Sequence, residues 1–167
     1  MEYLLLIYEF YATKRFYYIL KVVLVPMMAS FIIYDCISKI NNIDSEALSG
    51  NLITLIGVLF GFTISFYAII FSSNSPNINE AKNTLIGKSV FNKDFTIYDE
   101  IITGLAYSII LECLLIILNI FASVLHLEIF QFKILLSINF GFLTHIILVL
   151  LRIVLSFYFC ESKRIRN

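Results

Sequence analysis

The chain has 167 residues, of which 60% are hydrophobic and only 14% are charged, and its mean hydropathy is +0.91. Soluble domains are about 25% charged, so this composition indicates a membrane protein. The 12 basic and 12 acidic residues cancel. No net charge therefore draws in nucleic acid, and we expect no direct nucleic-acid binding.

Four stretches are long enough to cross a bilayer, which takes about 20 mainly apolar residues. They cover residues 16–37, 52–72, 101–125 and 134–159. The runs are continuous rather than alternating, which excludes a barrel, so each should be an α-helix. We predict an all-α fold, an integral membrane four-helix bundle that forms one domain over residues 1–167. Pro26 inside the first span predicts a kink or a freed backbone carbonyl.

Residues 1–13 precede the first span and mix Tyr, Leu, Phe and two Glu. This segment is either a helix in the membrane interface or an extension of the first span, and the sequence leaves both open. The orientation follows from the basic residues, which favour the cytoplasmic side. With both termini inside, nine of them are cytoplasmic and only Lys39 and Lys133 are outside. We therefore predict cytoplasmic N and C termini.

The cytoplasmic loop, residues 73–100, is the only sizeable segment outside the spans. Ser75 and Pro76 are typical of a helix N-cap and first helical position, and the helix should run to about Ile86, near Gly87. Residues 92–96 should form a turn, with Asp99 and Glu100 in the first turn of the third span. Basic side chains could contact lipid headgroups or a cytoplasmic protein partner. These are Lys82, Lys88, Lys93, Lys163, Arg164 and Arg166.

Small residues recur along one stripe of the second span. They are Gly57, Gly61, Ser65, Ala68 and Ser72. Small residues let membrane helices approach closely, as in the GxxxG pattern formed by Gly57 and Gly61. The stripe could serve packing inside one bundle, or packing between protomers or along a pore.

The third and fourth spans carry polar residues that we assign to a seam between them. These are Ser108, Glu112 and Asn119 on one helix, and Asn139, His145 and Arg152 on the other. Counted from the span edges at 1.5 Å per residue, Glu112 lies about 16 Å deep and Arg152 about 10 Å deep. Intramembrane charges usually pair, so we expect an ion pair between Glu112 and Arg152. The alternatives are a water-filled path lined by Glu112 and His145, and pairing between subunits.

Sequence patterns typical of enzymes are missing, including HExxH, GxSxG, a phosphate-binding glycine loop and CxxC. The three cysteines are scattered and odd in number, which argues against a zinc site or a disulfide framework. We therefore expect no catalytic activity, no metal and no cofactor.

Two resemblances follow from this plan. A four-span chain with one membrane carboxylate resembles the small multidrug exporters, although those are shorter and carry their Glu in the first span rather than the third. The size, the four spans with inside termini, the Gly57–Gly61 span followed by Phe71-Ser72-Ser73, and the cytoplasmic loop resemble small membrane proteins of bacterial anti-phage systems, such as the membrane subunit of Kiwa. That resemblance implies a homo-oligomer in the bacterial inner membrane that senses or permeabilises the membrane with a soluble companion.

We therefore expect a dimer or tetramer in the lipid bilayer that acts as the membrane component of an anti-phage system and engages a cytoplasmic protein. One alternative is an ion- or proton-coupled small transporter that uses Glu112. The other is a holin-like pore former.

Overall fold

Four long helices dominate the computed structural model, which describes residues 2–12, 16–40, 45–90, 93–125 and 129–164. The elements in chain order are α1 (Glu2–Ala12), α2 (Phe16–Ser38), α3 (Ser45–Ser72), α4 (Pro76–Asn83), β1 (Leu85–Val90), β2 (Lys93–Thr96), α5 (Ile97–Val124) and α6 (Ile129–Arg164). By length and composition, α2, α3, α5 and α6 could each cross a membrane. The prediction of an all-α fold with four membrane spans is confirmed.

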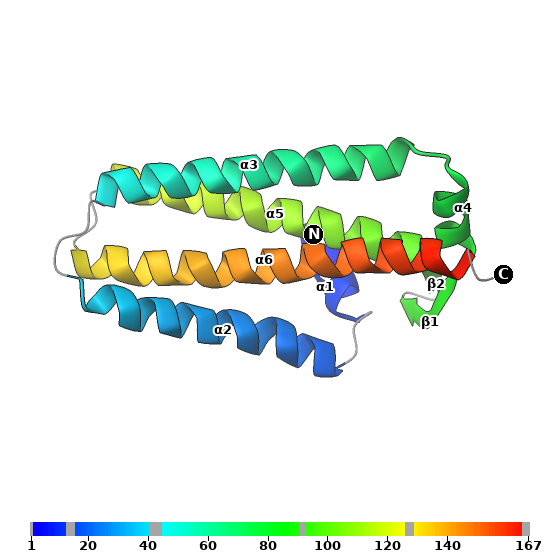
Figure 1. Ribbon diagram of the computed structural model, residues 1–167, viewed down its shortest axis with the longest axis horizontal. Helices are drawn as coiled ribbons and strands as arrows, with labels where there is room; N and C mark the ends of the chain where they lie inside the picture. Colours follow the sequence, from blue (N-terminus) through cyan, green and yellow to red (C-terminus); the bar gives the residue numbers. More distant parts are fainter. Residues whose placement is uncertain (1, 13–15, 41–44, 91–92, 126–128, 165–167) are drawn as a thin grey trace.

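The long helices alternate in direction and lie in the order α2, α6, α5, α3 (Figure 1), with the main contacts between neighbours in that order. The start of α2 and the end of α6 lie at the same end of the molecule as α4 and the β-hairpin. We call this the loop end and the opposite one the far end. Large apolar side chains stay exposed on the outer faces, among them Phe31 and Phe62 at 73% and 71%. Such faces suit hydrocarbon, where exposure carries no hydrophobic cost.

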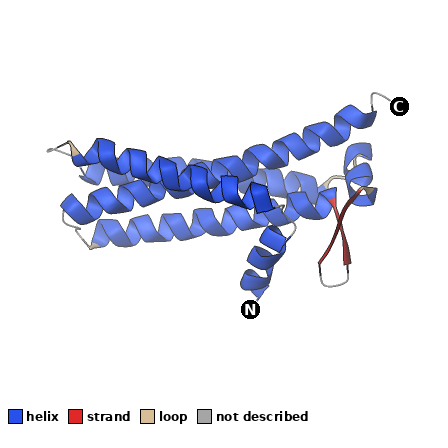
Figure 2. Ribbon diagram, turned by 90° about the horizontal axis from the view of Figure 1, so that it is seen from below, coloured by secondary structure: helices blue, strands red, loops and turns tan. Residues whose placement is uncertain are grey.

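Helix α1 is a separate element and not an extension of α2, because it ends at Ala12 while α2 begins at Phe16. Figure 2 shows it steeply inclined to the long helices. It is held against α5 by Phe10, which is buried and stacks on Tyr107 with ring centroids 4.3 Å apart. Gly104 of α5 lies beside this contact, where an added Cβ would be in ordinary contact with the Phe10 ring at 3.7 Å and would crowd Ile153 of α6 at 2.9 Å. Of the two alternatives for this segment, continuation of the first span is wrong.

Pro26 frees a backbone carbonyl in α2, as the sequence predicted. Proline has no N–H, so the carbonyl of Val22 loses its helical partner. His145 of α6 replaces that partner, with Nδ1 3.0 Å from the Val22 oxygen. One turn away, Gly141 of α6 lies directly against α2. An added Cβ there would overlap the Ser30 hydroxyl and would lie 3.2 Å from the Pro26 carbonyl oxygen.

The loop that follows α3 differs in part from the prediction. Ser75 caps α4 and Pro76 is its first residue, as expected, but the helix ends at Asn83 rather than near Ile86. Residues 85–90 form a strand that pairs antiparallel with β2, so residues 93–96 are a strand and not a turn. Residues 91 and 92 lie outside the described part of the chain. Gly87 has a φ of 72° at a shift in the strand register, which fits a bulge rather than a helix end.

The capping of α5 explains how the hairpin joins the spans. Thr96 and Asp99 form a reciprocal capping box, in which the Thr96 hydroxyl accepts from the Asp99 N–H and the Asp99 carboxylate accepts from the Thr96 N–H. The Ile97 N–H also donates to the Thr84 carbonyl at 3.0 Å. These bonds tie the end of α4 to the start of α5.

Gly141→Ala tests the close contact between α2 and α6. The added methyl group would meet Ser30 and the Pro26 carbonyl, so we expect the variant to unfold more readily in detergent by about 1–3 kcal/mol. Gly57→Ala is the control, because nothing lies within 4 Å of a Cβ added there. Equal stability of the two variants, measured by denaturant titration of helicity, would contradict the described packing.

Candidate functional site

Three polar contacts join α5 to α6, one near the loop end, one in the middle and one toward the far end. They pair Glu100 with Arg152, Tyr107 with His145, and Asn119 with Asn139. Unpaired polar groups are costly in hydrocarbon, so each contact favours one alignment of the two helices. Four of the six residues predicted for the seam take part in these contacts, namely Asn119, Asn139, His145 and Arg152, whereas Ser108 and Glu112 do not.

The contact nearest the loop end involves three helices. Arg152 donates from Nε and from a terminal nitrogen to the same oxygen of Glu100, at 3.1 and 2.9 Å. Its guanidinium also lies over the ring of Tyr18 from α2, with the central carbon 3.9 Å from the ring centroid. A guanidinium stacks well on an aromatic ring while it binds a carboxylate. Arg152 thus ties α2, α5 and α6 together where the spans meet the loop end.

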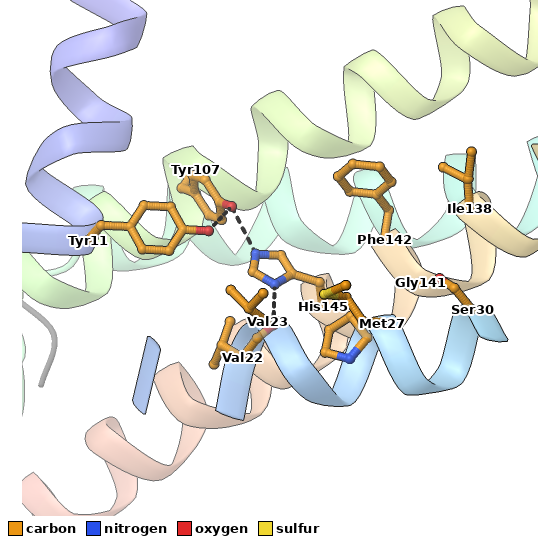
Figure 3. Close-up of a pocket in the computed structure, with 11 residues that line it drawn as sticks. Tyr11, Val22, Val23, Met27, Ser30, Tyr107, Ile138, Gly141, Phe142 and His145 are labelled. Carbon is orange, nitrogen blue, oxygen red and sulfur yellow. Dashed lines mark hydrogen bonds between the residues drawn. The ribbon is translucent and has the colours of Figure 1, made fainter. Parts of the chain in front are cut away.

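The middle contact belongs to a directed chain of hydrogen bonds (Figure 3). The Val22 carbonyl can only accept, so the hydrogen of neutral His145 is on Nδ1 and points at it. Nε2 is then an acceptor, and the Tyr107 hydroxyl, 2.8 Å away, donates to it. Tyr11 of α1 lies with its hydroxyl 3.0 Å from that of Tyr107 and donates in turn. Every hydrogen in this chain has an acceptor, and α1, α2, α5 and α6 are all linked by it.

The contact toward the far end is a pair of amides. The side chains of Asn119 and Asn139 donate to each other, both at 3.0 Å, and Asn119 also donates to the Leu115 carbonyl within its own helix. Both residues are almost completely buried. Interhelical bonds of this kind contribute about 0.6 kcal/mol on average and at most about 1.7 kcal/mol in a membrane protein. The sequence placed these two residues at similar depth, and the structure brings them together.

Glu112 turns toward α3 and not toward α6. It is fully buried, and its Oε1 lies 2.9 Å from the Thr63 hydroxyl oxygen. That hydroxyl also lies 3.0 Å from the Leu59 carbonyl oxygen. One hydroxyl hydrogen cannot serve two acceptors, so both contacts are satisfied only when Glu112 carries a proton and donates to Thr63. Within the described residues Oε2 has no hydrogen-bond partner, which fits a neutral acid better than a carboxylate.

The expected ion pair between Glu112 and Arg152 is wrong. Arg152 is level with Glu100, and Glu112 is twelve residues further along α5, about 18 Å along the axis. The predicted depths of Glu112 and Arg152 were counted from the ends of the two spans as if those ends were level. They are not level, because α6 runs on to Arg164, well past the level at which α5 begins. The prediction that Asn139 and His145 share one face of the helix was also inaccurate. A spacing of six residues leaves two side chains about 120° apart, whereas seven returns them to one face.

Sequence reasoning missed five side-chain partners in these contacts: Glu100, Tyr107, Thr63, Tyr11 and Tyr18. A signal was present for the first two. Glu100 and Tyr107 are seven residues apart, as are His145 and Arg152, so an antiparallel helix pair can match both contacts at once. Ser108, by contrast, is fully buried and donates to the Gly104 carbonyl of its own helix at 3.0 Å, so among the described residues it forms no hydrogen bond between helices.

A pocket of about 310 Å³ lies beside the hydrogen-bond chain, between α1, α2, α5 and α6. His145, Tyr107 and Tyr11 form one end of it, and Met27, Ile138 and Phe142 line its sides (Figure 3). A second pocket continues along α2 and α6 and shares Met27, Ser30 and Ile138 with the first. Among the described residues no group of three His, Cys, Asp or Glu side chains could hold a metal ion. The pocket is lined mainly by apolar side chains, which suits an apolar ligand.

The small stripe of α3 lies on its outer face. Gly57, Gly61, Ser65 and Ala68 are all exposed, and nothing lies within 4 Å of a Cβ added at either glycine. The buried positions of α3, including Ile56 and Thr63, occupy the opposite side of the helix. The stripe therefore takes no part in packing within one chain.

Of the basic residues assigned to a partner or to lipid, Lys82 is exposed, and its ammonium lies 4.9 Å from the centre of the Tyr98 ring. The side chains of Lys88, Lys93, Lys163 and Arg164, and the whole of Arg166, lie outside the described part of the chain. Their assignment stays a prediction.

A double-mutant cycle distinguishes the two possible partners of Arg152. The Arg152→Gln and Glu100→Gln changes should be coupled by about 0.5–1 kcal/mol, since they remove two ends of one partly exposed contact. Arg152→Gln and Glu112→Gln should be additive. Unfolding in mixed micelles measures both cycles, and coupling to Glu112 alone would overturn the pairing described here.

Glu112→Gln tests whether this residue is a neutral donor. A glutamine amide can donate to Thr63 much as a protonated acid does, so its stability should stay within about 0.5 kcal/mol of the unchanged protein. Thr63→Val leaves the buried acid without that partner and should cost about 1–3 kcal/mol. If Glu112→Gln proves the more damaging change, an ionised Glu112 is required instead.

No family model, curated protein or solved structure matches this chain.

Proposed function

We propose that this protein is a self-associating component of the bacterial inner membrane that acts in anti-phage defence together with a cytoplasmic protein. The outward-facing stripe of α3 carries the proposal. The defence role comes from the resemblance to small four-span anti-phage proteins. The cytoplasmic location of the loop end comes from the distribution of lysine and arginine.

The supporting observation is that the small residues line up on one exposed face of α3, where nothing in the described part of the chain lies within 4 Å of a Cβ added at Gly57 or Gly61. Membrane helices associate through small residues because lipid offers no hydrophobic drive between them. Here Gly57, Gly61, Ser65 and Ala68 face away from α5, so a second copy could approach the backbone of α3 closely. The hydroxyl of Ser65 already donates to the Gly61 carbonyl at 2.8 Å, so the stripe exposes little unpaired polarity.

The loop end supports a partner surface. Helix α4 and the β-hairpin stand outside the four spans (Figure 2), and the end of α4 is tied to the start of α5 by the bond from the Ile97 N–H to the Thr84 carbonyl. A rigid connection of this kind would pass a shift of α5 on to the hairpin. Leu85, at 59% exposure, and Lys82 supply apolar and cationic contact groups on this surface.

Coupled transport through Glu112 is the second candidate, and the buried acid favours it because intramembrane carboxyls often carry protons. Glu112 does not line the pockets beside His145, beside Tyr34 or beside Phe121, however. An exchanging carboxyl needs access from both sides. We therefore rank self-association above transport.

The test is to fill the stripe with the paired change Gly57→Leu and Gly61→Leu. Both positions have open space around them, so the fold of one chain should survive while the close approach of a second chain is blocked. We expect the variant to become monomeric in bilayers, measured by energy transfer between labelled chains, and to lose protection in phage plating with its neighbouring genes present.

Leu55→Phe is the matched control, since Leu55 is exposed on a different face of the same helix. It should leave both readouts unchanged. If the glycine variant still assembles, α3 is not the interface. If it becomes monomeric and yet protection persists, or if the unchanged protein gives no protection, the defence role is wrong. Substrate-dependent flux in proteoliposomes that Glu112→Gln abolishes would favour transport.

A further inference from the structure

The two pockets between α2 and α6 form one continuous groove, because they share Met27, Ser30 and Ile138. We call it the α2–α6 groove. It begins at Tyr34 and Ile134 near the far end and stops at Val22, near the start of α2, and at His145, near the middle of α6.

The length of the groove equals the depth of one leaflet. From Tyr34 to Val22 is twelve residues, or about 18 Å, and from Ile134 to His145 is about 16 Å, at 1.5 Å per residue. Half of a hydrocarbon core about 30 Å thick is about 15 Å. A groove of about 16–18 Å is therefore long enough to hold an acyl chain that reaches through about one leaflet.

The wall of the groove is apolar, and its inner end offers no free hydrogen. Val23, Met27, Phe31 and Phe142 are exposed along it. At the closed end the hydrogens of Tyr11, Tyr107 and His145 are all used in the chain that ends on Val22. A polar headgroup would find little to bind at that end, whereas a terminal methyl group would fit.

The mouth of the groove carries a cation. Lys133, next to Ile134, donates to the carbonyls of Ser38 and Ile40 at 3.3 and 2.8 Å. An ammonium has three hydrogens, so within the described residues one remains for a further acceptor. Lys39 is already paired with Asp35 at 2.7 Å. Lys133 therefore presents a positive group where a lipid phosphate would lie.

We propose that the α2–α6 groove binds one acyl chain of a membrane phospholipid, with the lipid phosphate at Lys133 and the chain end against His145. The groove opens directly onto the lipid-facing surface of the spans, so the occupant enters from the bilayer itself. The bound chain fills the space between α2 and α6 that Pro26 and Gly141 help to line.

The test uses a phospholipid that carries a photoreactive group near the end of one acyl chain, mixed into bilayers that contain the full-length protein. After illumination, mass spectrometry of peptides should find the label on residues of the groove wall, around Met27 and Ile138. Met27→Trp would fill the groove and should lose most of this label.

Met28→Trp is the matched control, because Met27 and Met28 are both 63% exposed and only Met27 lines the groove. This variant should keep the label. Circular dichroism checks that both variants are folded. Label spread evenly over all lipid-facing helices, or equal loss in both variants, would overturn the proposal. So would labelling of the groove by a photoreactive free alcohol but not by the phospholipid, since the occupant would then be a different lipophile.

Discussion

Lipid as the surrounding solvent is the constraint on which the rest of this structure depends. A polar group that faces hydrocarbon has no water to bind, so it must find a partner within the chain. The α5–α6 pair meets this requirement with an ion pair, a tyrosine–histidine bond and an amide pair at three depths. Together these contacts specify the register of two long apolar helices whose remaining surfaces would tolerate many alignments.

The same constraint explains the attachment of the outer helices. Proline in α2 removes one backbone bond, and the carbonyl set free at Val22 is bound by His145. That bond helps hold α2 on α6, while Glu112 and Thr63 link α5 to α3. Helix α1 joins through Tyr11 and the stacked Phe10. Each of these helices is thus positioned in part by one buried polar group. Substitution of those few residues should therefore destabilise the fold more than substitution elsewhere.

Much of the architecture could be predicted from local patterns. Continuous apolar runs predict the spans, Ser75-Pro76 predicts the start of α4, and Pro26 predicts a freed carbonyl in α2. The hairpin could not, since Leu85 and Ile86 suit a helix end as well as a strand and only pairing with β2 decides between them. In the site, Asn119 and Asn139 were placed at one depth correctly. The partner of Arg152 was not, because the charge on Glu100 lay at the edge of a span and was credited to helix capping. The alignment of α5 against α6 depends on all the contacts between the two helices. It therefore cannot be obtained by counting residues from the edge of each span.

The central claim is the pairing of buried groups between α5 and α6, and solid-state NMR of the protein in bilayers tests it most directly. With labelled arginine and glutamate, the account predicts a contact between the Arg152 guanidinium and the Glu100 carboxylate, and with labelled histidine and tyrosine it predicts one between the His145 and Tyr107 rings. A guanidinium contact to Glu112, with none to Glu100, would contradict it.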